Sequence, residues 1–266
     1  ILNLVLDPIF IFVFKMGIAG AAIATAISQC VSFGILLWWF IRGKTSVRLR
    51  LSLISRSPLT YLRTIKHGLP SFIRQTLASA ATIVLNVNAA LYGDAAVAAM
   101  SIVGRLFMFV FAVNLGIGQG YMPVAGYNYG AGRLDRLRSA FFFTLKLTTV
   151  TMLVSGVSFF WAAPFLIEIF IRTDREVVRI GTTALRAMSL AMPLVPLGVV
   201  CNMTFQSIGK SWAAMALSMA RQGIFFLPLI LILPRFMGLR GVQITQALSD
   251  LMTFLVSLPL VFFFFK

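Results

Sequence analysis

Negative charge is scarce in this chain. Of its 266 residues, only 7 are Asp or Glu and only 1 is His. Charged residues of both signs make up 11% of the chain, whereas a soluble domain carries about a quarter. Metal centres and acid–base catalytic sites are built from clustered carboxylates, His or Cys, and the sequence contains no such cluster. The composition therefore argues against an enzyme, including an enzyme embedded in a membrane.

Cysteine is nearly absent as well. Cys30 and Cys201, the two in the chain, each lie within an apolar stretch, so they indicate no disulfide framework. The sequence starts inside a hydrophobic run without a Met or a signal-peptide pattern, and it stops at Lys266 directly after four phenylalanines. We expect a fragment of a longer protein.

Long apolar runs dominate what is present. Hydrophobic residues make up 59% of the chain, and the mean hydropathy is +0.95. A helix that crosses a bilayer needs about 20 predominantly apolar residues. Seven such helices are predicted, at residues 18–41, 67–92, 95–121, 139–163, 181–207, 211–234 and 241–265. The predicted fold class is an all-α membrane protein, a polytopic helical bundle.

One stretch of the sequence returns 221 positions later. Residues 16–29 read MGIAGAAIATAISQ and residues 237–250 read MGLRGVQITQALSD, with six of the 14 positions identical. Each copy opens an apolar span, and six crossings separate the two, so both copies have the same orientation. Parallel repeats of helix bundles are typical of secondary transporters. We therefore predict one six-helix lobe of a two-lobe parallel-repeat transporter, preceded by the last helix of the other lobe.

The repeat and the positive charges together predict the domain organisation. Residues 1–41 are assigned to the end of the first lobe (the tail of helix five, and helix six), and residues 67–266 to the second six-helix lobe. Residues 42–66 contain seven basic and no acidic residues, and we expect them to form a basic cytoplasmic interlobe linker. Twelve Lys and Arg lie in connections on the side of this linker and six on the other side, so the C-terminus is predicted to be cytoplasmic. Because the basic residues are spread over these connections, the net charge of +16 does not indicate a nucleic-acid partner.

Three stretches resemble one transporter family. They are GIGQGYMPVAGYNYGAGR at residues 116–133, NLVLDPIF at residues 3–10 followed by GIAGAA at residues 17–22, and FQSIGK at residues 205–210 followed by Arg221, Gln222 and Pro228. Taken together they resemble the multidrug and toxic compound extrusion (MATE) transporters, in the bacterial branch of that family. The resemblance covers essentially the whole chain and corresponds to helices six to twelve.

The resemblance implies a twelve-helix, two-lobe exporter in the plasma (inner) membrane that expels cationic or amphiphilic compounds by alternating access. It implies a proton or sodium gradient as the driving force and no bound cofactor. The expected partners are the lipid bilayer, small amphiphilic or cationic substrates and the missing N-terminal lobe. Some members carry a coupling Glu in helix seven and an Asp in helix ten, but residues 71–80 and 188–206 contain no acid here.

Two other membrane functions compete with export. A lipid-linked oligosaccharide flippase shares the same general architecture, but its cavity needs many Arg and Lys to hold a pyrophosphate, and this half has few deep basic residues. A seven-helix receptor would match the helix count alone. The internal repeat argues against a receptor, because seven helices cannot form two equal halves.

The sequence offers one charged pair inside the membrane. Asp250 is the acidic residue that falls within a predicted span, and a charge at that depth is costly enough to indicate a function. Arg221 lies about sixteen residues before the turn at 237–238 and Asp250 about twelve after it, so their depths differ by roughly 6 Å. We predict an intramembrane ion pair, with a coupling-ion site at Asp250 as the alternative. Arg74, Lys146 and Arg186 lie nearer the ends of their spans, where snorkelling accounts for them.

Further candidates come from polar, soft and helix-breaking residues. Buried amides lack partners in lipid, and methionine offers an adaptable surface to varied ligands, so both favour positions that face a central cavity. The substrate-cavity candidates are Asn86, Gln119, Asn128, Met192, Asn202, Met203 and Gln206. The candidates for a helix break or a gate are Gly116, Gly118, Gly120, Pro123, Pro193 and Pro196. For the three glycines close helix packing is the alternative, because small residues let membrane helices approach.

Overall fold

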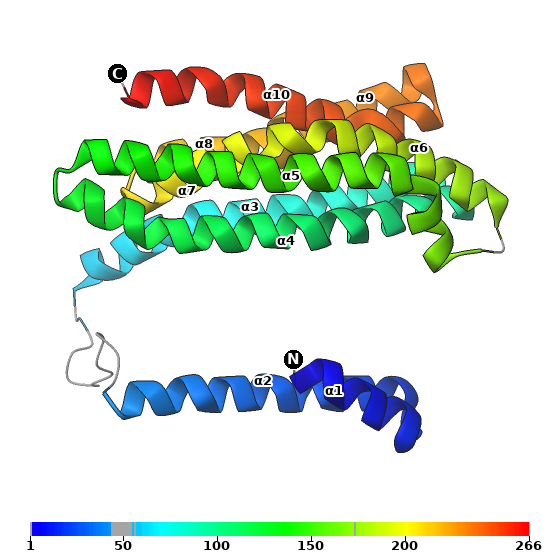
Figure 1. Ribbon diagram of the computed structural model, residues 1–266, viewed down its shortest axis with the longest axis horizontal. Coiled ribbons are helices and arrows are strands. Elements are labelled where there is room, and N and C mark those ends of the chain that lie inside the picture. Colours follow the sequence, from blue (N-terminus) through cyan, green and yellow to red (C-terminus); the bar gives the residue numbers. More distant parts are fainter. Residues whose placement is uncertain (1, 44–54, 56, 173, 266) are drawn as a thin grey trace. The chain divides into compact units, whose positions relative to one another are not determined.

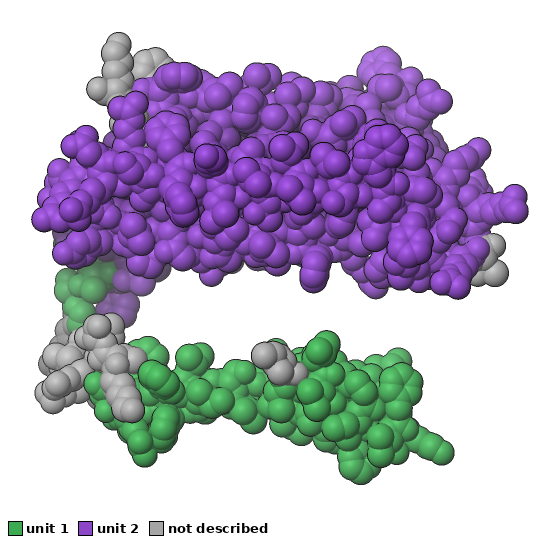
Figure 2. Space-filling view, viewed as in Figure 1, with its two compact units in different colours: residues 1–60 green, residues 61–266 purple. Residues whose placement is uncertain are grey.

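The chain forms two compact units of helices. The computed structural model describes residues 2–43, 55, 57–172 and 174–265, and every regular element within them is a helix. The two units comprise residues 1–60 and residues 61–266 (Figure 2). The division falls within the predicted linker 42–66, of which residues 44–54 and 56 lie outside the described part.

Unit 1 is a helical hairpin. It contains α1 (Leu2–Pro8), the π-helix η1 (Ile9–Val13) and α2 (Gly17–Ile41), and α1 and η1 pack against α2 (Figure 1). The corner between the two arms turns through Lys15 and Gly17, whose φ angles are +53° and +55°. Glycine tolerates such an angle without a steric penalty, which explains its place at the corner.

Unit 2 contains the remaining helices, except for the first three residues of α3, which fall in unit 1. In chain order these are α3 (Pro58–Ala90), α4 (Asp94–Gly130), α5 (Leu134–Phe170), α6 (Arg175–Ala191), the 3₁₀ turn η3 (Met192–Leu194), α7 (Val195–Ser207), α8 (Ser211–Met219), the π-helix η4 (Ala220–Phe225), α9 (Phe226–Met237) and α10 (Leu239–Phe265). The helices α4, α5 and α6 pack against one another, and α10 packs against α6, α7 and α9 (Figure 1).

α3 begins before the predicted span 67–92, within the residues assigned to the linker. The sequence placed residues 58–66 in the linker, but α3 already starts at Pro58. Proline is favoured in the first turn of a helix because it has no N–H to satisfy there. The carbonyl of Ser57, immediately before it, accepts the amide of Thr60 at 3.1 Å and starts the first turn. The last nine residues of the predicted linker therefore belong to a helix.

Six helical segments in the described part are long and apolar enough to cross a membrane. They coincide with six of the seven predicted spans, and the broken helices α6–α7 and α8–α9 count as one segment each. The seventh predicted span lies in α3, which has 33 residues but a more polar composition that includes Arg74, Asn86 and Asn88. The helices α4 and α5 have 37 residues each, about 55 Å, so they extend well beyond a hydrocarbon core of about 30 Å.

The internal repeat is visible in the backbone. Gly17 and Gly238, which are equivalent positions, both have positive φ angles, of +55° and +58°. Three residues later, a Cβ added to Gly20 would lie 2.8 Å from the carbonyl oxygen of Phe10, and one added to Gly241 would lie 2.5 Å from the carbonyl carbon of Leu233. Both copies of the repeat therefore begin with the same tight corner. In each, a glycine packs against the backbone of the preceding helix.

The same face of the helix is also buried in both copies. The buried residues are Gly20, Ala24 and Ser28 in α2, and the equivalent Gly241, Thr245 and Ser249 in α10. Four-residue spacing aligns these positions on one side of each helix. The repeat thus has a structural meaning, because the small residues it preserves are those that let two helices approach closely.

This corner leads to a first prediction, for Gly241→Ala in the full-length protein. The added methyl group would meet backbone atoms of Leu233 and Pro234 at 2.5 to 2.7 Å, so the two helices must separate. We expect destabilisation by about 1–3 kcal/mol, the usual cost of overpacking, seen as a lower melting temperature in detergent. Gly104→Ala is the matched control, since nothing lies within 4 Å of its added Cβ. Equal melting temperatures for the two variants would contradict the prediction.

A second prediction concerns Asn114, which is fully buried in α4. Neither polar atom of its side chain has a hydrogen-bond partner within the described residues. An unsatisfied buried amide costs about 1–3 kcal/mol, so Asn114→Leu should raise the melting temperature. Asn88→Leu serves as the control, because the Asn88 amide donates to the Val84 carbonyl at 2.9 Å. A lower melting temperature for Asn114→Leu would show that this amide has a partner in the full-length protein.

Candidate functional site

The described part of unit 2 contains a large, partly open cavity. Its volume is about 680 Å³, and its walls come from α3, α4, η3, α7, α8, η4 and α10. Most of the lining is apolar, with Phe111, Leu115 and Val199 among it, and a smaller number of polar side chains interrupt that surface. A concave, mainly apolar cavity with few polar groups is the usual form of a site for small molecules.

Four of the predicted cavity residues line this space: Gln119, Asn202, Met203 and Gln206. The amide of Gln206 donates to the hydroxyl of Ser71 at 2.6 Å, which joins α7 to α3. The amide of Asn202 donates to the hydroxyl of Ser218 at 2.8 Å, which joins α7 to α8. These two amides therefore help to hold the wall together, and a role in binding substrate remains a prediction.

The other three candidates lie elsewhere. Met192 is fully buried in the core, within the turn η3. The amide of Asn128 donates to the Val124 carbonyl of its own helix at 2.8 Å. Asn86 lies eight residues beyond Ala78, the last residue of α3 that lines the cavity, which is about 12 Å along the helix. Side-chain chemistry alone selected these residues, polar for the two Asn and soft for Met192, and it could not show which face of a helix they occupy.

The predicted helix breaks have two different outcomes. Around Gly116, Gly118, Gly120 and Pro123 the break does not occur, because α4 runs continuously from Asp94 to Gly130. Gly118 instead makes room for a neighbour, since a Cβ added there would collide with the Met203 side chain. At Gly118 this motif therefore serves close packing of α4 on α7.

Pro193 and Pro196 do interrupt their span, as predicted. The helix changes to the 3₁₀ turn η3 at Met192–Leu194, and α7 then continues from Val195. The Ser189 carbonyl, four residues before Pro193, is turned toward α5, where an added Cβ on Gly156 would lie 2.8 Å from its oxygen. The freed carbonyl thus meets a glycine in the core and does not line the cavity.

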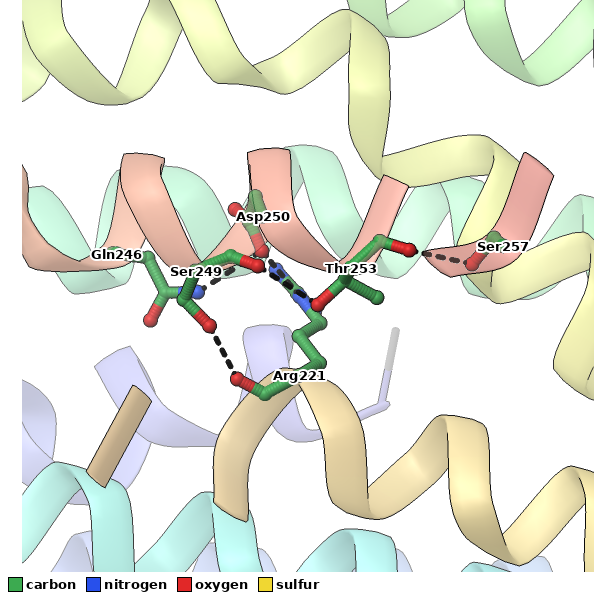
Figure 3. Close-up of polar contacts among 6 residues, drawn as sticks. All are labelled: Arg221, Gln246, Ser249, Asp250, Thr253 and Ser257. Atoms are coloured by element: carbon green, nitrogen blue, oxygen red, sulfur yellow. Dashed lines mark hydrogen bonds and ion pairs between the residues drawn. The ribbon is translucent and has the colours of Figure 1, made fainter. Parts of the chain in front are cut away.

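The predicted ion pair between Arg221 and Asp250 is present in the cavity wall (Figure 3). The Nε atom of Arg221 donates to Oδ1 of Asp250 at 2.6 Å, and the Gln246 amide donates to the same oxygen at 3.2 Å. Asp250 is 2% exposed, whereas Arg221 reaches the cavity surface. The Arg221 guanidinium also lies 4.9 Å from the centre of the Phe111 ring, so cation–π attraction adds to the pair.

The π-helix η4 explains how Arg221 reaches this place. A π-turn widens a helix and leaves backbone groups without their usual partners, and such turns are frequent at functional sites. In η4 the Arg221 carbonyl accepts a hydrogen bond from the Ser249 hydroxyl at 2.5 Å (Figure 3). Arg221 is therefore fixed to α10 twice, through its side chain and through its backbone.

Sequence reasoning missed a row of hydroxyl groups on α10. Thr245, Ser249, Thr253 and Ser257 follow one another at four-residue spacing, and all four are buried. The Thr253 and Ser257 hydroxyls donate to the carbonyls of Ser249 and Thr253, at 2.8 and 2.7 Å (Figure 3). The spacing was visible in the sequence and could have identified this face of α10.

Sequence reasoning also missed the position of Arg74. Snorkelling was expected to account for it, but its side chain lines the cavity together with Ser71 and Ala78 of α3. The spacing of these three residues, at i, i+3 and i+7, places them on one face of the helix. Unlike Arg221, Arg74 makes no ion pair or hydrogen bond within the described part of the chain.

Unit 1 holds a separate polar cluster. The Asn3 amide lies 3.2 Å from both Asp7 Oδ1 and the Thr25 hydroxyl oxygen, and that hydroxyl donates to the Ala21 carbonyl at 2.9 Å. From the sequence, Asp7 and Pro8 were expected to close the tail of helix five, as part of the family motif, whereas the helical conformation continues through η1 (Ile9–Val13). In the structure the Asp7 carboxylate lies inside the apolar helical segment Leu2–Val13 and has no basic partner among the described residues.

The chain matches a known family and its solved structures. A family model described as MatE matches residues 70–232. A multidrug export protein MepA of Staphylococcus aureus is 25% identical over 261 residues, and that of Staphylococcus saprophyticus is 26% identical over 262 residues. Each of these matches covers 98% of this chain and 57% of the relative, so the chain spans little more than half the length of these curated proteins.

The likeness extends to the fold. A crystal structure of a MATE transporter in complex with MaL6 matches with a TM-score of 0.88 and 27% identity, over 96% of this chain and 58% of that one. A transporter of the MOP superfamily from Pyrococcus furiosus, whose binding pocket is described as having reversed polarity, matches with a TM-score of 0.87 and 28% identity. That second match also covers 96% of this chain and 58% of the other.

Proposed function

Since this chain belongs to the MatE family, we propose that the protein of which it forms part exports amphiphilic small molecules across the plasma membrane. The observation that carries the proposal is the cavity of about 680 Å³ among membrane-spanning helices. Its apolar walls suit the hydrophobic part of an amphiphile, and its few polar groups suit the head. A large cavity with soft side chains such as Met122 and Met203 also suits ligands of varied shape.

We propose that an ion gradient drives export, by alternating access between two lobes. Of the seven acids, Asp94, Asp135, Asp174 and Glu176 lie at the starts of helices, and Glu168 lies near the end of α5. The remaining two are within apolar segments, and Arg221 neutralises Asp250. Asp7 is then the carboxylate best suited to bind a coupling proton or sodium ion, and the Asn3 amide nitrogen that contacts its carboxylate also contacts the Thr25 hydroxyl.

Export is tested with the full-length protein in inverted membrane vesicles of an exporter-deficient bacterium. We expect uptake of an amphiphilic dye that depends on the ion gradient and stops when an ionophore dissipates that gradient. Vesicles that carry this chain alone should not take up dye, because the proposed alternating access needs two lobes and this chain supplies one. Uptake that ignores the ionophore would contradict gradient-driven export, and no uptake of any amphiphile would contradict export itself.

A further inference from the structure

The charges around the cavity do not balance. Its lining contains three charged side chains, which are Arg74, Arg221 and Asp250. The Asp250 carboxylate is already bound by Arg221 at 2.6 Å and by the Gln246 amide at 3.2 Å. Within the described residues no acid contacts Arg74, so one positive charge faces the cavity without compensation.

Neutral groups in the same cavity can add hydrogen bonds to an anion. Ser71, one helical turn before Arg74, accepts the Gln206 amide at 2.6 Å. Gln119 and Gln222 line the same cavity and make no hydrogen bond within the described part of the chain. A guanidinium can bind a carboxylate, sulfonate or phosphate through charge-assisted hydrogen bonds, and amide donors of the same cavity can add further hydrogen bonds to it.

The remaining walls decide what kind of anion fits. Phe111, Leu115, Met122 and Val199 give the cavity a mainly apolar surface, which a small inorganic anion would leave uncovered. The low local dielectric also strengthens the attraction of Arg74 for a negative group and its repulsion of a positive one. An amphiphile with an acidic group fits both features.

We infer that the substrate of this cavity carries an anionic group that binds Arg74, so that the exporter prefers zwitterionic or acidic amphiphiles to simple lipophilic cations. The inference rests on the proposed export function. It departs from the cationic substrates expected from the family resemblance, because a cation would place a second positive charge beside Arg74. Arg74 thereby becomes a specificity-determining residue.

The test compares compounds that differ in one charge. The full-length protein in nanodiscs of phosphatidylcholine is titrated with norfloxacin, with norfloxacin methyl ester and with tetraphenylphosphonium. The ester keeps the amine and the ring system but removes the carboxylate. We expect the wild-type protein to bind the acid at least tenfold more tightly than the ester, and inverted vesicles to export the acid faster.

Variants then assign the preference to Arg74. Arg74→Gln should weaken binding of the acid at least tenfold and leave the ester within twofold, while Arg74→Lys should retain part of the preference. Lys146→Gln is the control, because it removes the same charge from an exposed position on α5 that does not line the cavity. If Arg74→Gln does not fold, the ratio of acid to ester in the wild-type protein still decides the inference.

Several outcomes would overturn the inference that the substrate carries an anionic group bound by Arg74. Equal binding of acid and ester by the wild-type protein would mean that Arg74 is neutralised by another part of the protein. An equal loss for both compounds in Arg74→Gln would assign Arg74 a structural role. Export of the ester or of tetraphenylphosphonium without preference for the acid would refute the substrate class and leave export standing, whereas export of none of the three would refute both.

Discussion

Replacing Asp250 with asparagine should remove most of the folded full-length protein from the membrane. The substitution leaves the Arg221 guanidinium without its counter-charge in a buried wall where Asp250 is 2% exposed. Removing one partner of a buried ion pair costs about 3–5 kcal/mol, which is a large part of the stability of a typical domain. The measurement is the amount of monodisperse protein after extraction, together with its melting temperature.

The double variant Arg221→Gln/Asp250→Asn separates the pair from its members. It removes both charges, so it should recover much of the stability lost in the single variant. Glu168→Gln is the control for loss of a negative charge, since Glu168 is exposed near the end of α5. A normal yield for Asp250→Asn together with loss of gradient-driven export would show instead that Asp250 binds the coupling ion.

Replacing Asp7 with asparagine should have the opposite pattern, with normal folding and more than a tenfold loss of gradient-driven export. The new amide side chain would be nearly the same size and could still hydrogen-bond to Asn3, so the hairpin of unit 1 should keep its structure. It could no longer carry the negative charge that a proton or sodium ion requires. Dye uptake by inverted vesicles, measured at equal protein amounts, provides the readout.

Asp94→Asn is the matched control for Asp7→Asn, because Asp94 is exposed at the start of α4. It should leave the rate of export unchanged within about twofold. If Asp7→Asn exports normally under the same gradient, Asp7 is not the carboxylate that binds the coupling ion. Facilitated exchange of substrate without a gradient should survive in Asp7→Asn, because the cavity lies in unit 2.

Much of the architecture followed from the sequence because lipid imposes a simple rule. A bilayer accepts helices of about 20 apolar residues, so hydropathy placed six spans that the structure also contains. The pairing of Arg221 with Asp250 was also predictable, because helical rise converts their distances from the turn at Gly238 into similar depths. The length of an apolar span and the depth of a residue within it can both be counted directly along the sequence.

Two features were harder to predict from the sequence. One is which face of each helix lines the cavity, and the other is where a helix is broken or becomes a π-helix. Asn86 and Asn128 are as polar as Asn202, yet only Asn202 lines the cavity, because the neighbours of each helix decide which face is enclosed. The glycines near Gly118 left close packing and a local break both open, and the structure shows that Met203 fills the space beside Gly118 in a continuous α4. The π-helix η4 has no simple sequence signal, although it places Arg221 in the wall of the cavity.

The 3₁₀ turn η3 has a mechanical consequence. Pro193 and Pro196 have no amide hydrogen, so a tilt of α7 about this turn breaks no hydrogen bond donated by either residue. The arm beyond the turn, α7, has 13 residues or about 20 Å, and a tilt of about 10° would move its far end by about 3 Å. Asn202 and Gln206 lie on α7 and line the cavity. A small rotation of α7 about η3 would therefore change the width of the cavity near Ser71, the residue to which Gln206 is hydrogen-bonded.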